Sequence, residues 1–288
     1  IFLNVIIMEL YFIHICNEWY LNLYNEYIVN IILFINNKFN LKIQNLLIDE
    51  NKNYIIEFNK VYNKNNKYIF TGNTECINTI FEKYRNRNFY YLNVEQMSKE
   101  SYFDNVKKID NQINIIDYSE ENIPFLKSHF KKVFLIPPIY LNHNLHIIKD
   151  KNIISFSNNE YRINFLKNIN SKFNVEYIDN VFGEERDNIF KRSKIYINIH
   201  SSETHKTMEL IRIINLLKNN VIVLSQNSIF PELLRISKSI IIFNNIEQLE
   251  YLLDDILNNY KAYYEYIFKT TFLHYDTYVY NHIKSILF

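Results

Sequence analysis

A row of polar side chains follows an apolar stretch in the last third of the chain. Residues 195–199 have the pattern of a buried strand, and His200 comes directly after them. The next segment is expected to be a helix, and it carries Glu209, Arg212 and Asn215 at intervals of three, so they form one polar row on its surface. In open α/β sheets, ligands lie outside the carboxyl ends of the strands, where helix N-termini offer N–H groups to phosphate. This row therefore predicts a ligand site, and the plain alternative is a solvated ion pair between Glu209 and Arg212.

Two acidic residues in the first half of the chain also follow expected strands. Glu95 comes at the end of the apolar run 89–94, and Asp117 follows the run 113–116. At the carboxyl end of a strand, either carboxylate could act as a general base toward a hydroxyl group. For Asp117 the structural alternative is capping of the helix that begins near Ser119. Both interpretations stay open for each acid.

The remaining chemical signals are weaker. His205 and Glu209 stand four residues apart but have no third ligand nearby in the sequence, so we expect no metal site. Neither Gly72 nor Gly183 belongs to a P-loop or a dinucleotide fingerprint. Nucleoside triphosphate hydrolysis and hydride transfer therefore lack their usual phosphate-binding loop, and we expect no cofactor.

Alternating strands and helices must position these residues. Parallel strands are joined by long crossovers, usually helices, so this alternation predicts parallel sheets covered on both faces. The strands are expected at residues 43–48, 67–70, 89–94, 113–116, 133–136, 153–156, 175–178, 195–199, 221–224 and 240–243. The series restarts after Pro137-Pro138, which predicts two domains in series.

The predicted boundaries give an N-terminal Rossmann-like domain over residues 1–141, a second one over 142–258, and a helical tail over 259–288 that packs back on the first domain. The opening run of residues 1–16 is apolar but contains Glu9, and it is shorter than the roughly 20 residues of a spanning helix. We therefore expect a buried first strand there and no transmembrane segment.

The composition narrows the classes of function. Lys and Arg number 32 against 31 Asp and Glu, so no strong field would hold a nucleic acid over the whole surface. Cys16 and Cys76 are too few for a disulfide framework and lack metal-site spacing, which fits a cytoplasmic protein. The chain has only 2 Gly, so Asn is expected to replace Gly where the backbone needs a positive φ.

The segment IYINIHSSETHKTMELIRIINLLKNNVIVLS resembles the donor-site segment of glycosyltransferases with the GT-B fold, the glycosyl transferase group 1-like family. Three upstream stretches resemble that family in the same order, namely FYYLNVEQMS, IIDYSEENI and VFGEERDNIFKRSK. The resemblance implies two Rossmann-like domains with parallel sheets facing a cleft. It also implies that the second domain binds a nucleoside diphosphate sugar and that the first holds a glycan, lipid or protein acceptor.

The same resemblance assigns roles to residues. Basic side chains offset charge on the leaving diphosphate, a role that falls to Arg212 with help from Lys206, while Glu209 orients Arg212. Such stabilisation needs no metal. Eight residues are expected around the donor: Asn198, His200, Ser201, Lys206, Glu209, Arg212, Asn215 and Ser225.

The chain departs from the family at four positions. Asn215 and Gln226 stand where Glu is usual, and Asn220 and Phe156 stand where Gly is usual. An amide at position 215 can still accept a bond from a ribose hydroxyl, but a weaker one than a carboxylate accepts. One alternative is thus a catalytically degenerate protein that binds sugar nucleotides or serves as a partner subunit. Another is an unrelated small-molecule α/β enzyme built on a single closed sheet.

Overall fold

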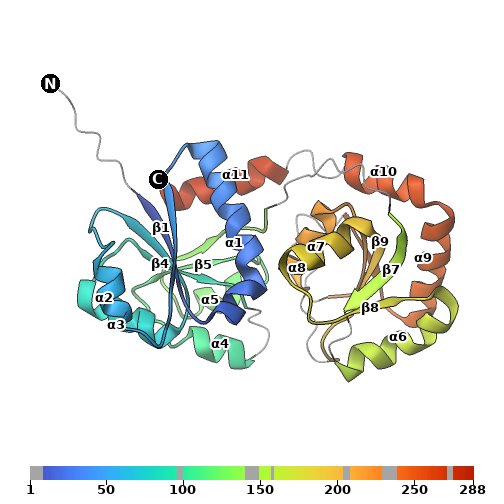
Figure 1. The fold of residues 1–288 in the computed structure, drawn as a ribbon, viewed down its shortest axis with the longest axis horizontal. Coiled ribbons are helices and arrows are strands. Elements are labelled where there is room, and N and C mark those ends of the chain that lie inside the picture. Colours follow the sequence, from blue (N-terminus) through green and yellow to red (C-terminus); the bar gives the residue numbers. More distant parts are fainter. Residues whose placement is uncertain are drawn as a thin grey trace. The chain divides into compact units, whose positions relative to one another are not determined.

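The computed structural model describes residues 9–95, 100–139, 149–156, 159–203, 208–228, 239–270 and 275–288. They form two compact units (Figure 1). Unit 1 comprises the chain up to Pro137 together with Tyr280–Phe288, and unit 2 comprises Pro138–Val279. Each unit contains one parallel β-sheet with helices, so the predicted pair of Rossmann-like domains is confirmed and a single closed sheet is excluded.

The sheet of unit 1 has six strands in the order β2-β1-β3-β4-β5-β6, and all neighbouring pairs are parallel. The strands are β1 (Leu10–Ile15), β2 (Ile43–Ile48), β3 (Lys67–Gly72), β4 (Phe89–Asn93), β5 (Asn114–Asp117) and β6 (Val133–Leu135). Ile15 at the end of β1 pairs with Ile48 in β2 and with Gly72 in β3, so these strands end level with one another. Their carboxyl ends therefore share one edge of the sheet.

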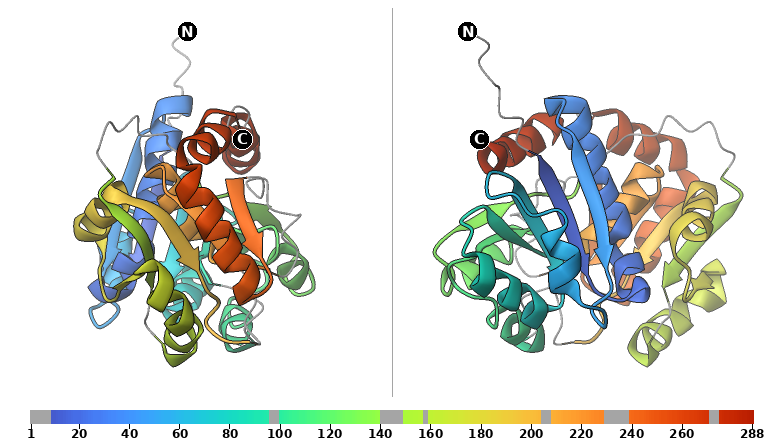
Figure 2. Two further views of the ribbon diagram at one scale, coloured as in Figure 1. Left: turned by 90° about the vertical axis from the view of Figure 1, so that its right-hand side faces the viewer. Right: turned by 60° about the vertical axis from the view of Figure 1, so that its left-hand side comes forward.

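Helices cover both faces of this sheet. They are α1 (Glu18–Phe39), α2 (Tyr54–Asn59), α3 (Thr74–Tyr84), α4 (Glu100–Val106) and α5 (Ile123–Lys127). Figure 2 shows α1 on the face of the sheet opposite to α2 and α3. The short helices α2 and α4 have no counterpart in the sequence-based expectations, because one or two turns are too short for a clear helical period.

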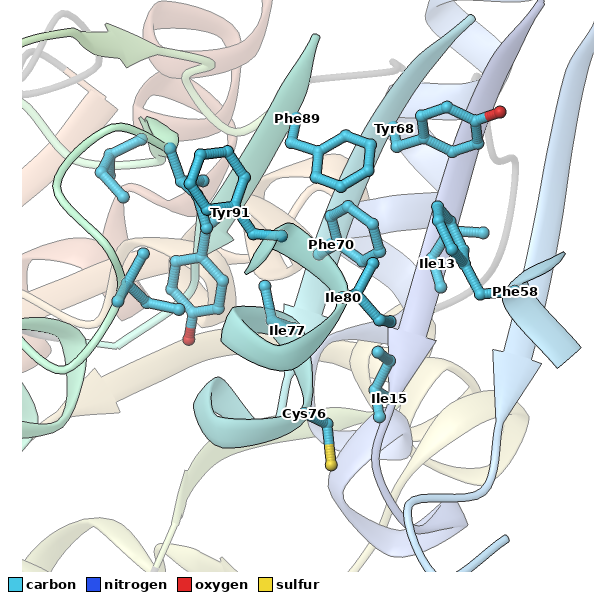
Figure 3. Close-up of a cluster of buried hydrophobic side chains, with 14 of the residues drawn as sticks. Ile13, Ile15, Phe58, Tyr68, Phe70, Cys76, Ile77, Ile80, Phe89 and Tyr91 are labelled. Carbon is cyan, nitrogen blue, oxygen red and sulfur yellow. The ribbon is translucent and has the colours of Figure 1, made fainter. Parts of the chain in front are cut away.

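Aromatic and aliphatic side chains form the core beneath α2 and α3 (Figure 3). Phe58 of α2 is fully buried, and its ring lies 5.2 Å from that of Tyr68 and 5.5 Å from that of Phe70, centroid to centroid. Ile77 and Ile80 of α3 are buried in the same cluster. Aromatic rings at these separations pack tightly, so this cluster fixes α2 and α3 against the sheet.

The final helix, α11 (Tyr275–Leu287), returns to unit 1. Its Tyr280 ring stacks on Phe39 of α1, with 4.8 Å between centroids and 6° between planes. The Lys67 ammonium at the start of β3 donates hydrogen bonds of 2.6 Å to the carbonyl oxygens of Ile286 and Leu287. A cation at a helix C-terminus satisfies carbonyls that have no partner within the helix.

The sheet of unit 2 has five parallel strands in the order β11-β10-β9-β7-β8. The strands are β7 (Lys151–Phe156), β8 (Glu176–Ile178), β9 (Ser193–Asn198), β10 (Ile222–Gln226) and β11 (Ile240–Phe243). The helices are α6 (Glu160–Phe173), α7 (Gly183–Arg192), α8 (Leu210–Lys218), α9 (Ile246–Asn258) and α10 (Tyr260–Thr270). Each strand lies where an apolar run predicts one, with ends that shift by a few residues.

Asparagine residues lie at the ends of several helices. The side chains of Asn53, Asn73, Asn159 and Asn245 each accept a backbone N–H bond at a helix start. Thr74 is the first residue of α3, and Asn73 caps that helix. Asn220 has φ +56 just after α8, so the predicted substitution of Asn for Gly in a left-handed conformation is confirmed.

Within the described ranges, no helix is both long and apolar enough to span a membrane.

Candidate functional site

Two neighbouring strands of unit 2, β9 and β10, end in polar residues. β7, β9 and β10 are adjacent and parallel, so Asn198 at the end of β9 and Ser225 near the end of β10 lie at one edge. The Asn198 amide donates a 3.0 Å hydrogen bond to the Ser225 hydroxyl, which in turn donates to the Gln226 carbonyl oxygen. Two of the predicted donor-site residues are therefore in direct contact. Lys206, another of them, lies outside the described residues.

Glu209 lies between two guanidinium groups. It precedes α8, and its carboxylate accepts a 2.7 Å bond from Arg162 of α6 and forms a second ion pair with Arg212. The Arg162 side chain is only 3% exposed, and its Nε also donates to the Ile199 carbonyl oxygen at 2.9 Å. Burial opposes ionisation of Glu209, but Arg212 and Arg162 together hold the pKa of its carboxyl below the usual value. The predicted Glu209–Arg212 pair is thus one half of a partly buried cluster.

Sequence reasoning missed Arg162. It lies 47 residues before Glu209, in the first turn of α6, which follows the carboxyl end of β7. In a parallel sheet, the first turn of the helix after each strand lies at the same edge. An Arg or Lys in such a turn is the sequence signal that could have identified Arg162. The cluster thus joins two segments that only the sheet order brings together.

The ring of Phe156 supports Arg212. The guanidinium carbon lies 4.6 Å from the ring centroid, a distance typical of a cation–π contact. Phe156 is the last residue of β7 and stands where the resembled family usually has Gly. Arg212 is therefore held on one side by Glu209 and on another by an aromatic face, while its side chain remains 26% exposed. Exposed N–H groups on a fixed guanidinium suit a bidentate anion.

Backbone bonds fix the loop after β9. The Gln226 side chain accepts a 2.9 Å bond from the His200 backbone N–H, and the His200 Nε2 donates to the Asn227 carbonyl oxygen at 2.9 Å. The Asn159 amide donates to the Ser201 carbonyl oxygen at 3.2 Å. Gln226, a departure from the resembled family, therefore joins the loop after β9 to the end of β10. His200 and Gln226 also line a hollow of about 740 Å³ between α6 and the start of α9.

Two buried amide oxygens at this edge have no hydrogen-bond partner in the part of the chain that the structure describes. They are Oδ1 of Asn198, which is fully buried, and Oδ1 of Asn215 in the second turn of α8. Buried polar atoms are nearly always paired in native proteins, and each exception calls for an explanation. An amide oxygen accepts hydrogen bonds from hydroxyl or N–H groups.

In unit 1, Asp117 is fully buried at the end of β5. Its carboxylate accepts bonds from the Asn93 amide at 2.6 Å, the Ser119 backbone N–H at 2.7 Å and the Asn122 amide at 3.0 Å. Burial raises the pKa of Asp117 to about 7 against the opposing effect of these bonds. The bond to Ser119 is the one that the structural interpretation of Asp117 expects.

Glu95 is held by the same network and lies closer to solvent. The amides of Asn93 and Asn122 both donate to the Glu95 carbonyl oxygen, at 2.8 and 2.9 Å. Its half-buried side chain lines a hollow of about 510 Å³ at the carboxyl edge of the sheet. Glu50 and Glu75 line the same hollow, and the sequence analysis found neither. Within the described residues, no group of three or more His, Cys, Asp or Glu side chains could hold a metal ion.

Solved structures show which fold this is. The structure of WaaG, a glycosyltransferase involved in lipopolysaccharide biosynthesis, aligns with a TM-score of 0.55 and 9% identity over 92% of this chain and 95% of that one. A putative UDP-N-acetylglucosamine 2-epimerase from Listeria monocytogenes aligns with a TM-score of 0.51 and 10% identity over 96% and 94%. At such identities the likeness shows the fold alone, and that fold is the predicted GT-B fold.

Curated sequences show the family. No protein-family model matches the sequence. It is 26% identical over 273 residues to the uncharacterized protein L137 of Acanthamoeba polyphaga mimivirus, of which it spans 35%. It is 32% identical over 192 residues to the uncharacterized protein R358 of the same virus, an alignment that covers 64% of this chain and 67% of that protein. The chain therefore belongs to the family of the mimivirus protein R358, and it has the GT-B fold.

Proposed function

We propose that this protein is a glycosyltransferase that moves a sugar from a nucleoside diphosphate sugar to an acceptor hydroxyl. The observation that carries the proposal is the cluster of Arg162, Glu209 and Arg212 at the carboxyl edge of the unit 2 sheet. Two guanidiniums against one carboxylate leave one positive charge in excess. An excess positive charge at the place where parallel sheets bind ligands suits a diphosphate.

Each member of the cluster has a distinct role in this proposal. Arg212 contacts the diphosphate, because it is the more exposed of the two arginines and has N–H groups beyond those that Glu209 engages. Glu209 and Arg162 are positioning residues that fix the Arg212 plane. The unpaired oxygens of Asn198 and Asn215 accept bonds from ribose or sugar hydroxyls.

The reaction itself is a displacement at the anomeric carbon. The acceptor oxygen forms a bond to that carbon, and the bond from the carbon to the diphosphate oxygen breaks. The electron pair leaves on the diphosphate, where Arg212 offsets the added charge. The acceptor proton passes to a general base, for which we propose Glu95, with Asp117 acting through Asn93 and Asn122 to hold the Glu95 main chain in place.

Calorimetry with a panel of nucleoside diphosphates tests the donor site. We expect Arg212→Ala to weaken binding by about 30-fold, since a charge-assisted hydrogen bond contributes about 2 kcal/mol, and we expect Arg212→Lys to recover part of the loss. Arg192→Ala is the matched control, because Arg192 is an exposed arginine of the same unit that pairs with Asp150. Absence of binding at millimolar concentrations, or an equal loss in the control, would end the proposal.

Asn215 favours a second candidate, a catalytically degenerate GT-B protein. A neutral amide replaces the usual carboxylate at this position and forms a weaker bond to a ribose hydroxyl. This candidate predicts nucleotide binding without release of nucleoside diphosphate from any sugar nucleotide. Turnover of one sugar nucleotide excludes it, and binding without turnover across the panel favours it over the enzyme.

A further inference from the structure

The hollow of about 740 Å³ in unit 2 lies beside the ion cluster, at the carboxyl edge of the sheet. It is lined by the loops after β9 and β10, by the start of α9 and by one face of α6. Tyr161, Phe165 and Asn168 are spaced by four and three residues, so they share that face of α6. Arg162 is the neighbour of Tyr161, but its guanidinium contacts Glu209 instead. The hollow and the ion cluster therefore lie on different faces of the first turn of α6.

Contacts within unit 2 hold the walls of this hollow. The Phe165 ring lies 6.2 Å from that of Phe243 in β11, centroid to centroid. Further along α6, the Lys172 ammonium pairs with the Asp254 carboxylate of α9 at 2.8 Å. The Asn245 side chain caps α9 by accepting a bond from the Gln248 backbone N–H. The positions of α6 and α9 are thus set by the protein itself, and the hollow is preformed.

His200 connects the hollow with the ion cluster. It lines the hollow, and it lies close enough to Glu209 for an electrostatic interaction with that carboxylate. The Gln226 side chain, which also lines the hollow, accepts a bond from the His200 backbone N–H at 2.9 Å. A ligand that Arg212 holds by its diphosphate can therefore extend past His200 into the hollow.

Ser228 provides an independent sign of a ligand. Its side chain lines the hollow and is only 8% exposed. Its hydroxyl oxygen is buried and has no hydrogen-bond partner within the described residues. A hydroxyl can donate one bond and accept others, and buried polar atoms are nearly always paired. A ligand that carries hydroxyl groups would supply the partner.

The charges around the hollow select against an anionic group. Among its described lining residues there is no Lys or Arg, whereas Glu203 and Glu247 are both present and exposed. Two carboxylates and no basic side chain disfavour a further negative charge. Side-chain amides make up much of the remaining polar lining, and they form hydrogen bonds with neutral hydroxyl groups. They belong to Asn164, Asn168, Asn227 and Asn244.

We propose that this hollow receives the transferred sugar and that this sugar carries no negative charge. Its volume lies within the range of small-molecule pockets, about 300–1,000 Å³. A sugar hydroxyl completes the Ser228 hydrogen bond. A uronic acid would instead add a carboxylate beside Glu203 and Glu247, with no Lys or Arg in the described lining to pair with it. The inference rests on the proposed transferase function, because the diphosphate on Arg212 directs the sugar into the hollow.

Matched sugar nucleotides test the preference for an uncharged sugar. UDP-glucose is compared with UDP-glucuronic acid, and GDP-mannose with GDP-mannuronic acid, by calorimetry on the full chain, with free UDP and GDP as references. For the base that binds, we expect the neutral sugar nucleotide to bind at least about tenfold more tightly than the acid, and the difference to shrink at high salt. Equal binding of the two, tighter binding of the acid, or binding of the free diphosphate alone would overturn the inference.

A serine variant locates the sugar. Ser228→Ala should weaken binding of the neutral sugar nucleotide about threefold or more and leave binding of the free diphosphate unchanged, because only the sugar meets this hydroxyl. Ser171→Ala is the control, since Ser171 is an exposed serine of the same unit outside the hollow. Equal weakening of the free diphosphate and the sugar nucleotide by Ser228→Ala would place the nucleotide in the hollow and contradict the assignment.

Glutamate variants test the source of the discrimination. The double variant Glu203→Gln with Glu247→Gln should bring the acid to within about threefold of the neutral sugar nucleotide, because it removes both carboxylates. Glu265→Gln is the control, since Glu265 pairs with Lys269 outside the hollow. An unchanged preference in the double variant would show that these carboxylates do not select the sugar.

The two proposals fail in distinguishable ways. Binding of free nucleoside diphosphates, measured on the same samples, reports on Arg212. If none binds, the transferase function fails and this inference fails with it. If a diphosphate binds but its neutral and acidic sugar nucleotides are not distinguished, the transferase function stands and only the assignment of the hollow is removed.

Discussion

The carboxyl edges of the two sheets differ in charge although their architecture is alike. In unit 2 two arginines surround one glutamate, whereas in unit 1 three glutamates line a hollow that has no basic residue among its described lining. Side-chain amides support both edges. They are those of Asn159 and Asn198 in unit 2, and those of Asn73, Asn93 and Asn122 in unit 1. One layer architecture can therefore carry edges of opposite charge through a few side chains at the strand ends.

The largest expected effect is on stability, and it concerns the edge of the unit 2 sheet that carries Arg162 and Arg212. Glu209→Ala leaves the buried Arg162 guanidinium without its carboxylate, which should lower the free energy of unfolding by about 3–5 kcal/mol. Urea denaturation of the purified variant measures this change. Glu265→Ala, which removes an exposed pair with Lys269, is the control and should cost less than about 0.5 kcal/mol. Similar losses in both variants would show that the edge of unit 2 depends little on its buried ions.

The next largest effect concerns the close backbone packing at the carboxyl edge of the unit 1 sheet. Gly72→Ala places a Cβ against the Ile15 carbonyl in a left-handed backbone, which should lower the free energy of unfolding by about 3 kcal/mol or more. Gly183→Ala is a matched control, because Gly183 has φ +56 with nothing within 4 Å of the added Cβ. That variant should lose only about 1 kcal/mol, the cost of the backbone conformation. Thermal and urea unfolding of the pair separate the two contributions.

A pH profile distinguishes the two edges further. Asp117 has a pKa of about 7 in the folded protein and 3.8 ordinarily, so between these values the folded state binds more protons than the unfolded state. Its contribution to stability is therefore full below the lower value and is lost as the pH rises toward 7, at up to about 1.4 kcal/mol per pH unit. Asp117→Asn should remove this component of the slope in urea unfolding. Parallel profiles for the wild type and the variant would contradict the assigned pKa.

The smallest expected effect concerns the unpaired oxygens of unit 2. Asn215→Leu replaces a buried amide whose oxygen has no partner among the described residues, and it should raise the free energy of unfolding by about 1 kcal/mol. Nucleoside diphosphate binding should weaken in the same variant. Asn219→Leu, which removes a bond from the Asn219 amide to the Asn215 carbonyl oxygen, should instead lower stability by about 1 kcal/mol. Destabilisation by both variants would mean that Asn215 has a structural role.

Strand positions could be predicted from the sequence because each strand is a short, continuous apolar run. β9 and β10, for example, are almost fully buried, as expected for parallel strands covered on both faces. The pairing order could not be predicted, since β7 pairs with β9 and not only with its neighbour in sequence, β8. Local patterns carry no information about such crossovers.

The candidate site was predictable in part for the same reason. Glu209 and Arg212 lie on one helix, so their spacing alone placed them together. Arg162 was missed because its position beside Glu209 depends on which strands are neighbours. For Asp117, the sequence left catalysis and capping open, and its complete burial could not be predicted from the local pattern.

The contact between Lys67 and the last turn of α11 makes unit 1 discontinuous along the chain. The Lys67 ammonium bonds to a carbonyl that lies 219 residues further on. A ribosome must therefore synthesise all of unit 2 before unit 1 can complete its own contacts. Contacts of such long sequence separation form slowly, because the chain loses the most entropy in closing them. Unit 2 can finish folding first, even though its residues are made later than most of unit 1.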